Sequence, residues 1–295
     1  MSYSDFIDHP QLMFNDDNND NKNTLSRGFG SNCGRRALIV GIDYLTVPGL
    51  TLGGCVNDAI SMRGFLNGKY GEIRMCVDRD IVPKANGGLP TRQNILQGIF
   101  WMLENAKSGD KLFWHYSGHG SFAVDTNRDE IDRRDECLVP LDTRKTGYIV
   151  DDTLNAILVQ HMKPGVTLHV LFDCCHSGTA LDLPYVLQSG RHPITGVSTK
   201  TIQKPPKSFK PTICGNVILF SACSDTQYAQ EAPADKTGRS NGAMTRAFLE
   251  LFGRSGTMPT YGQALRVLRN SVSRYGQTVQ ISSNSFINER SQIGF

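Results

Sequence analysis

The chain has 295 residues, of which 39% are hydrophobic and 20% are charged, and it contains 29 glycines and 13 prolines. These proportions exclude a collagen, a coiled-coil rod and a wholly disordered chain, and the length suffices for one large domain with a substantial core. The formal net charge is only +3, and no basic stripe is visible in the sequence, so nucleic acid is not expected as a partner.

Three features bear on where the protein resides. No apolar run approaches the roughly 18–20 residues that a membrane span requires. The opening residues, MSYSDFIDHP, contain neither the basic nor the apolar stretch of a secretory signal. Eight cysteines are scattered over a chain that is too large to need disulfides for its stability, a pattern typical of reduced thiols. We therefore expect a cytoplasmic protein.

The first segment, residues 1–34, differs in composition from the rest. Its stretch Asn15–Asn23 (NDDNNDNKN) is polar and of low complexity, and such a sequence cannot bury enough apolar surface to fold alone. We expect a short Asn/Asp-rich arm, which is either a disordered tail or a prodomain whose apolar clusters dock on the folded body. Residues 35–295 are expected to form a single domain.

From Arg36 onward, short apolar runs of strand length alternate with helical patterns. In residues 91–107, for example, Ile95, Ile99 and Met102 fall on one helical face. Strands that are apolar on both faces and alternate with helices predict an α/β fold, with a mainly parallel central sheet covered by helices on both faces. Strands are expected at 37–42, 73–77, 112–116, 168–172 and 217–221, and helices at 56–67, 91–107, 152–162, 242–252 and 261–275.

One later stretch lacks periodicity. Residues 187–211 (LQSGRHPITGVSTKTIQKPPKSFKP) are rich in Ser, Thr, Pro and Lys, so they are expected to form an exposed loop. This loop would separate a larger portion of the domain, residues 35–186, from a smaller portion, residues 212–295, within a single sheet.

Candidate catalytic residues follow two of the predicted strands. In an open α/β sheet, ligands bind outside the carboxyl ends of the strands. One strand leads into Ser117–Gly120 (SGHG), and another leads into Asp173–Gly178 (DCCHSG). Flanking glycines expose His119, and Cys175 lies where backbone N–H groups and a nearby imidazolium favour the thiolate. Such a Cys–His pair is typical of a nucleophilic cysteine peptidase.

The two motifs together resemble those of the metacaspases, a family of cysteine peptidases with the caspase fold. The resemblance runs from about Arg36 to the C-terminus, and the segments GCVNDA, CLVPLD, IVDD and GTALDLPY are most similar to type I, single-chain members of the kinetoplastid kind. It implies a caspase-like sandwich, a catalytic dyad of His119 and Cys175, and a buried neighbour at Cys174. Backbone N–H groups of Gly120 and Cys175 would stabilise the oxyanion.

Two carboxylates near the dyad bear on specificity. Asp58 begins the helix after the first strand, and Asp173 precedes the nucleophile by two residues. Each could simply cap a helix, but carboxylates crowded at a cleft are costly unless a cation binds them. In the resembling family these two residues and Ser117 line an acidic S1 pocket. That pocket implies protein or peptide substrates cleaved after Arg or Lys.

The resemblance also implies a calcium site, with Asp135, Asp151, Asp152 and Asp182 as its ligands. Oxygen ligands from separate loops suit Ca²⁺, because this ion tolerates irregular geometry. Alternatively, Asp151 and Asp152 only cap the helix that follows them. Because Asp182 lies seven residues beyond Cys175, a bound ion would order the loop that shapes the cleft. Calcium would then activate the enzyme without taking part in the chemistry.

The expected function is therefore that of a calcium-dependent cysteine endopeptidase. We expect a monomer, made as a zymogen, with autocatalytic cleavage at basic residues such as Arg27, Arg35, Lys204 or Lys207. Two alternatives stay open at this point. One is a non-catalytic caspase-fold protein that binds partners through its cleft. The other is a peptidase of the same fold with a different P1 preference.

Overall fold

A computed structural model shows how the chain folds. The residues that it describes all belong to one unit, Cys33–Phe295. The predicted arm, apart from Gly34, lies outside the described residues, and its role stays a prediction. The described residues are 34–79, 86–124, 134–175, 180–190, 198–203, 212–222, 231–232, 241–253 and 256–295.

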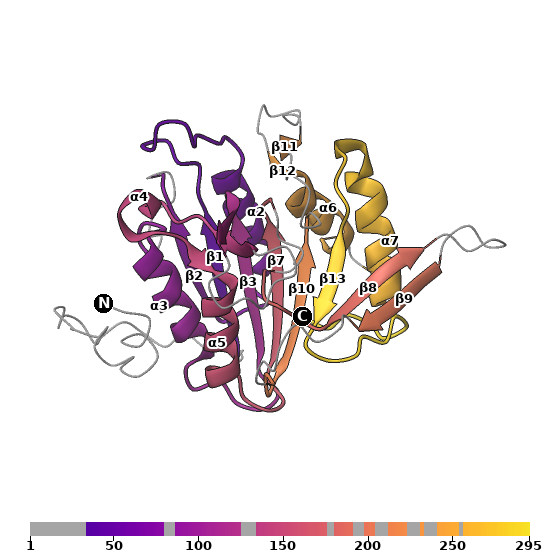
Figure 1. The fold of residues 1–295 in the computed structure, drawn as a ribbon. Helices are drawn as coiled ribbons and strands as arrows, with labels where there is room; N and C mark the ends of the chain where they lie inside the picture. Colours follow the sequence, from indigo (N-terminus) through magenta and orange to yellow (C-terminus); the bar gives the residue numbers. More distant parts are fainter. Residues whose placement is uncertain are drawn as a thin grey trace. The chain divides into compact units, whose positions relative to one another are not determined.

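Eight strands form a central sheet (Figure 1). In chain order they are β1 (Arg35–Gly41), β2 (Glu72–Val77), β3 (Lys111–Ser117), β7 (Thr167–Asp173), β8 (Tyr185–Gly190), β9 (Ser198–Gln203), β10 (Asn216–Ser221) and β13 (Gln280–Ser283). Their order across the sheet is β2-β1-β3-β7-β10-β13-β8-β9. From β2 to β10 neighbouring strands are parallel, whereas β13, β8 and β9 pair antiparallel. The five predicted strands are confirmed as the parallel part.

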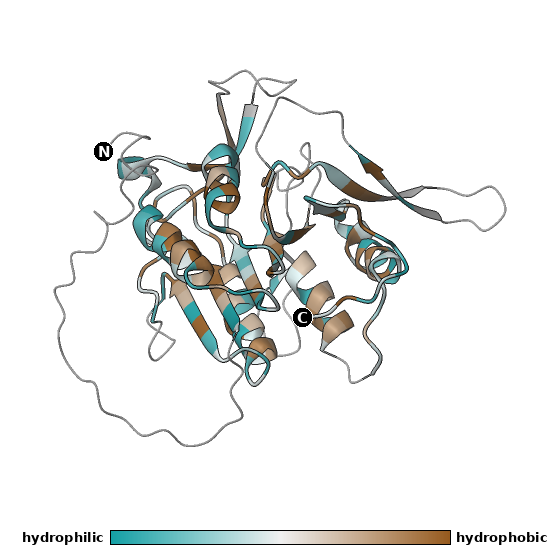
Figure 2. Cartoon of the chain, turned by 90° about the horizontal axis from the view of Figure 1, so that it is seen from below, coloured by the Kyte–Doolittle hydropathy of each residue, from teal (hydrophilic) through white to brown (hydrophobic). Residues whose placement is uncertain are grey.

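Helices cover both faces of the sheet, as predicted (Figure 1). The helices α2 (Cys55–Leu66), α6 (Ala243–Phe252) and α7 (Tyr261–Val272) lie on one face. The other face carries α3 (Arg92–Leu103) and α5 (Asp151–His161). A four-residue helix, α4 (Thr143–Thr146), and a 3₁₀ turn, Ser273–Tyr275, complete the helical elements of the described residues. Apolar and hydrophilic residues both occur along the helices (Figure 2). In α6 and α7 they lie on opposite sides, which is the pattern that buries one face against a sheet.

Alternation along β3 decides which side chains reach which face. Phe113 packs in the core with residues of α2 and α6, and the ring of Trp114, its neighbour in sequence, contacts Phe172 at 4.9 Å instead. Because successive strand residues point to opposite faces, His115 and Ser117 share the face of Phe113. Ser117 is the last residue of β3, so this face carries the first residue of the SGHG motif at the carboxyl end of the sheet.

Two small sheets flank that end of the structure. One is antiparallel and contains β4 (Gly120–Val124), β5 (Arg134–Leu138) and β6 (Ile149–Val150). The other pairs β11 (Glu231–Ala232) with β12 (Asn241–Gly242). Neither is expected from the sequence. β6, β11 and β12 have two residues each, too few for an alternation to be recognised, and β4 (GSFAV) and β5 (RDECL) lack the continuous apolar run of the strands in the central sheet.

The structure differs from the expected loop at residues 187–211. Residues 187–190 belong to β8 and residues 198–203 form β9, so the two strands make an antiparallel hairpin at the edge of the central sheet. Leu187 is 1% exposed and pairs with Ile281 of β13. β9 has no apolar run that would predict a strand, because an edge strand needs few apolar residues. The larger and smaller portions of the domain are therefore joined through strands of one sheet.

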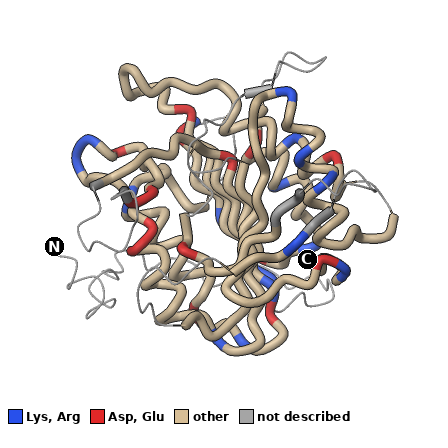
Figure 3. The backbone as a smooth tube through the Cα atoms, turned by 45° about the vertical axis from the view of Figure 1, so that its right-hand side comes forward, with Lys and Arg blue, Asp and Glu red and all other residues tan. Residues whose placement is uncertain are grey.

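The distribution of charge separates the interior from the surface. Lys, Arg, Asp and Glu intermingle over the elements around the central sheet (Figure 3). Among the described residues, every buried charged side chain is acidic, namely Asp43, Asp58, Asp135, Glu136, Asp151 and Asp173. A protein whose overall charge is slightly positive thus collects carboxyl groups in its interior. None of the helices in the described part of the chain is long and apolar enough to cross a membrane.

Candidate active site

Strand pairing brings His119 and Cys175 to the same edge of the sheet. On the neighbouring parallel strands β3 and β7, Ser117 is the register partner of Asp173. Each residue of the predicted dyad lies two positions beyond this pair. The two backbones are also in close contact, since a methyl group on Gly120 would collide with the carbonyl oxygen of Cys175. Only glycine permits this approach, which explains the glycine after His119.

The imidazole of His119 is held in one orientation. Its Nε2 donates a hydrogen bond to the carbonyl oxygen of Leu50 at 2.8 Å, and its ring packs against Tyr44 with 4.9 Å between the ring centroids. The Tyr44 hydroxyl also accepts from the backbone N–H of His119 at 3.0 Å. Because a carbonyl can only accept, Nε2 carries the proton, and Nδ1 is the nitrogen left to exchange a proton during a reaction.

Accessibility distinguishes Cys175 from two other cysteines near it. Cys175 is half-buried, whereas Cys174 and Cys55 are buried. Burial raises the pKa of Cys55 well above its ordinary value, so that residue is a protonated thiol. Of these three, Cys175 is the one that is exposed in part. Residues 176–179, which follow Cys175, lie outside the described residues.

The predicted acidic pocket residues come together at the amino end of α6. The Ser117 hydroxyl donates to Asp58 Oδ2 at 2.8 Å, and a methyl group on Gly242 would collide with Asp173 Oδ2 and lie 2.8 Å from Asp58 Oδ2. The two carboxylates therefore flank the same glycine. Asp58 lies inside α2, which is capped by Gly54, so the alternative that Asp58 is an N-cap does not hold.

Burial makes this carboxylate pair costly. Asp58 is fully buried and Asp173 is 4% exposed. Burial, followed by the charge of Asp173, raises the pKa of Asp58 well above its ordinary value, and burial raises the pKa of Asp173 to about 6. In addition, Asp173 Oδ1 is buried and has no hydrogen-bond partner among the described residues. A cationic group would satisfy that oxygen and compensate the charge.

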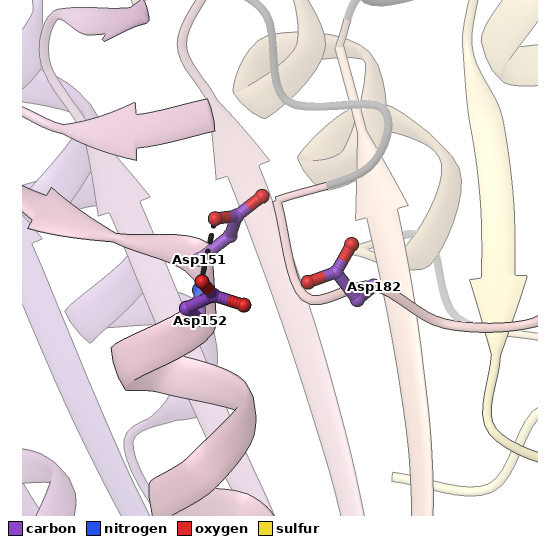
Figure 4. Close-up of side chains that lie close together, drawn as sticks. All are labelled: Asp151, Asp152 and Asp182. Carbon is purple, nitrogen blue, oxygen red and sulfur yellow. Dashed lines mark hydrogen bonds between the residues drawn. The ribbon is translucent and has the colours of Figure 1, made fainter. Parts of the chain in front are cut away.

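A second acidic group lies on the other face of the sheet (Figure 4). One carboxylate oxygen from each of Asp151, Asp152 and Asp182 lies within 4.8 Å of the others. Asp151 and Asp152 begin α5, while Asp182 comes from the segment before β8. Burial, the charge of Asp182 and contact with Glu136 raise the pKa of Asp151 to about 10. Three oxygen donors from two segments are a set that suits Ca²⁺.

Comparison with known proteins identifies the family. A profile described as metacaspase, peptidase C14 domain, matches residues 35–184, about half of the chain. The chain belongs to the metacaspase family. It is 36% identical over 242 residues to Metacaspase-3 of Arabidopsis thaliana, covering 81% of this chain and 65% of the relative. It is 35% identical over 292 residues to Metacaspase-1B of Aspergillus niger, covering 85% of this chain and 66% of the relative.

The match covers only part of each relative. The chain spans only 56–65% of the length of three Arabidopsis metacaspases. A crystal structure of a protein from Geobacter sulfurreducens is 21% identical and superposes with a TM-score of 0.59, covering 88% of this chain and 97% of the other. At that identity the likeness concerns the fold alone. Together with the family profile, it confirms the caspase-like α/β fold of this metacaspase.

Sequence reasoning missed the residue that anchors the loop behind His119. Asp43 follows β1 and is fully buried. Its Oδ1 accepts from the N–H groups of Cys55 (2.9 Å) and Val56 (3.3 Å) at the start of α2, and its Oδ2 lies 2.7 Å from the guanidinium of Arg79. The Asp43 carbonyl also accepts from Leu52 at 2.8 Å. An acidic residue directly after a buried strand is the signal that could have revealed it.

Glu136 is a second residue that the motifs did not predict. It is 3% exposed on β5. Its backbone N–H donates to Asp151 Oδ2 at 3.3 Å, and its side chain is hydrogen-bonded to Asp151. The predicted ligand beside it, Asp135, is also buried on β5 but does not belong to the group within 4.8 Å. Its role as a ligand in this metacaspase stays a prediction.

The alternative that Asp151 and Asp152 cap α5 is wrong, because the N-cap of this helix is Val150 and no side chain makes a capping hydrogen bond there. Asp151 Oδ1 accepts from the N–H of Asp152 at 2.8 Å, in the first turn of the helix. This contact uses one oxygen of one carboxylate. Asp182 comes from a different segment of the chain, so its closeness to Asp151 is not explained by helix capping.

Proposed function

We propose that this metacaspase is a cysteine endopeptidase that cleaves peptide bonds after Arg or Lys, with Cys175 as nucleophile and His119 as general acid and base. The observation that carries the proposal is the buried Oδ1 of Asp173, which has no hydrogen-bond partner among the described residues and lies two residues before a half-buried cysteine. An acidic acceptor in this place suits the cationic end of a P1 side chain. Asp173 is only two residues from Cys175. A P1 side chain bound at Asp173 would therefore have its scissile bond near the nucleophile.

The reaction would follow the chemistry of a thiolate–imidazolium pair. Cys175 Sγ attacks the carbonyl carbon, and the carbonyl π electrons move to oxygen to give a tetrahedral oxyanion. The oxyanion collapses as His119 Nδ1 gives a proton to the departing amine, leaving a thioester. Water then attacks the thioester carbon while His119 Nδ1 takes its proton. Collapse of the second oxyanion breaks the C–S bond, releases the acid product and restores the Cys175 thiolate beside the imidazolium.

Backbone N–H groups of Gly120 and Cys175 would stabilise the oxyanion. The proposal is supported by the closeness of the two backbones, since the position of a methyl group on Gly120 lies 3.4 Å from the Cys175 nitrogen. Two such donors aimed at the developing charge contribute about 3–4 kcal/mol each in comparable sites.

The rival functions differ from this one in a measurable way. A partner-binding protein of the same fold needs neither a reactive thiol nor an oriented imidazole, and this chain has both residues at the same sheet edge.

The direct test is hydrolysis of fluorogenic peptides that end in Arg, Lys, Asp or citrulline, the uncharged isostere of Arg. We expect turnover of the Arg and Lys peptides only. Turnover of the Asp peptide alone would identify the alternative specificity, and turnover of none would favour the binding protein.

We also propose that Ca²⁺ binds Asp151, Asp152 and Asp182, with Asp135 as a predicted fourth ligand. The support comes from the donor set and from the raised pKa of Asp151. A bound divalent cation would offset the free-energy cost of ionising this buried carboxyl group. Asp182 lies in the segment that leads from Cys175 to β8. Ordering this segment would favour the active conformation without any part in bond cleavage.

Calcium is therefore expected to raise the melting temperature by a few degrees at about 100 times its dissociation constant, since such a ligand stabilises by about 2.7 kcal/mol. Chelation should abolish turnover and leave the circular dichroism spectrum unchanged. Asp182→Asn should remove the calcium-dependent shift. Asp110→Asn, at the opposite end of the sheet, is the matched control and should keep it. An equal shift in both variants would contradict the proposed ligands.

Autocatalytic cleavage is proposed as a regulatory step of the same activity. Of the four basic candidates, Arg35 begins β1, and its carbonyl accepts from the N–H of Gly71 at 3.1 Å, so it is the least suited to cleavage. Arg27, Lys204 and Lys207 lie outside the described residues. N-terminal sequencing after calcium addition should give new termini after one of these three. Cys175→Ala should remain intact, and full activity of an uncleaved wild-type chain would contradict the zymogen.

Protein substrates, a monomeric state and a cytoplasmic location complete the proposal. The edge strand β9 exposes Lys200 and Gln203, and charged or polar residues on an edge discourage strand pairing between molecules. Gel filtration that gives a dimer would contradict this part of the proposal.

A further inference from the structure

A buried chain of hydrogen bonds lies behind the acidic pocket. Thr245, in the first turn of α6, donates its backbone N–H to Asp173 Oδ2 at 2.7 Å, and its hydroxyl is also hydrogen-bonded to Asp173. On β3, His115 Nε2 lies 3.1 Å from the Thr245 hydroxyl oxygen. His115 and Thr245 are both fully buried. Neither residue is needed for the proposed bond cleavage, and neither is adjacent in sequence to the motifs.

The direction of each hydrogen bond follows from the inventory of protons. A threonine hydroxyl has one proton, so donating it to the Asp173 carboxylate leaves only an acceptor for His115. His115 Nε2 must then carry a proton. Burial lowers the pKa of His115 to about 3, so the ring is neutral at physiological pH. Its Nδ1 is unprotonated and has no hydrogen-bond partner among the described residues.

The two carboxylates of the pocket are bound differently. Asp58 accepts from three neutral donors, the Ser117 hydroxyl (2.8 Å), the Asn241 amide (2.9 Å) and the Gly242 N–H (2.9 and 3.0 Å), and these contacts occupy both of its oxygens. At Asp173, Thr245 holds Oδ2, while Oδ1 is buried without a partner among the described residues. Among the described residues, Oδ1 of Asp173 is thus the one oxygen of the pair without a hydrogen-bond partner.

We propose that Thr245 and His115 are positioning residues that select the P1 side chain, by fixing Asp173 so that its Oδ1 is the atom that pairs with the substrate cation. His115 orients the Thr245 hydroxyl, and Thr245 prevents the carboxylate from rotating its free oxygen away. The inference rests on the proposed acidic S1 pocket. It adds two residues, from β3 and α6, that act through Asp173 and do not touch the substrate.

The test uses the ratio of kcat/KM for a peptide ending in Arg to that for the same peptide ending in citrulline. This ratio is measured within one preparation, so it does not depend on the fraction of enzyme that is folded. Thr245→Val removes the hydroxyl at constant shape and should lower the ratio about tenfold, the size expected for one hydrogen bond to a charged group. Thr245→Ser keeps the hydroxyl and should restore the ratio to within about twofold of wild type.

His115 is tested by the same ratio. Glutamine places an amide N–H near the position of Nε2, whereas leucine offers no donor. His115→Leu should therefore lower the ratio and His115→Gln should restore most of it. Equal losses for the Arg and citrulline peptides in Thr245→Val and His115→Leu would show a purely structural role and overturn the inference. A wild-type enzyme with no preference for Arg over citrulline would instead overturn the proposed pocket itself, so the two failures are distinguishable.

Discussion

Replacing Cys175 by alanine is expected to reduce turnover of Arg and Lys peptides by at least about 10⁴-fold, because no other group can form the thioester. The measurement is the initial rate with calcium present. The His119→Ala variant should lose activity to a similar extent, since thiolate and imidazole act as a unit. The double variant should then be no worse than either single variant, which is the behaviour of groups that work together.

The adjacent cysteine supplies the matched control. Cys174 is buried at 1% exposure, and Cys174→Ala removes a thiol of the same motif without removing the nucleophile. It should retain turnover within about an order of magnitude, with a modest loss of stability from the small cavity. A loss in Cys174→Ala as large as that in Cys175→Ala would reverse the assignment of the nucleophile.

The second large effect is expected for Asp173→Asn, which keeps the shape of the side chain and removes its charge. Unpairing a buried charge costs about 3–5 kcal/mol, so kcat/KM for Arg peptides should fall by about 10²–10³-fold. The loss should be much smaller for the citrulline peptide, which brings no cation to the pocket. Michaelis–Menten kinetics on the two peptides give both values.

Asp110→Asn is the control for this change. Asp110 precedes β3 at the amino end of the parallel strands, where its carboxylate accepts from the N–H of Lys107 at 2.9 Å. The same chemical change at that end of the sheet should leave the Arg-to-citrulline ratio as in the wild type. If Asp173→Asn also left the ratio unchanged, Asp173 would have no role in P1 recognition.

The secondary structure of the parallel half follows closely from local patterning. Runs such as ALIVG in β1 and LHVLF in β7 are apolar on both faces, and this pattern is typical of strands covered on both sides. The helices between them begin and end within a few residues of their expected bounds, except that α3 ends at Leu103. Glu104 leaves the helical conformation there, and Asn105 has a positive φ of 56°.

Local patterning does not predict the antiparallel half of the sheet. β13 has four residues, and β9 (STKTIQ) is polar on an edge. The hairpin of β8 and β9 joins the sheet because β8 pairs with β13, which is distant in sequence. The hydroxyl of Thr201 in β9 also donates to the Ile287 carbonyl at 2.6 Å. A local window of sequence contains no trace of β13, and for this reason local patterning predicts a loop here.

By itself, the sequence determined the parallel strands, the helices between them and the two chemical motifs that follow β3 and β7. These depend on side-chain periodicity and on residue types that are contiguous in the chain. Only the tertiary structure decided that Leu50 orients His119, that Asp43 anchors the intervening loop, and that Thr245 and His115 stand behind Asp173. The physical reason is that each of these contacts is a hydrogen bond between groups on different elements, and which groups meet depends on how helices and strands pack together.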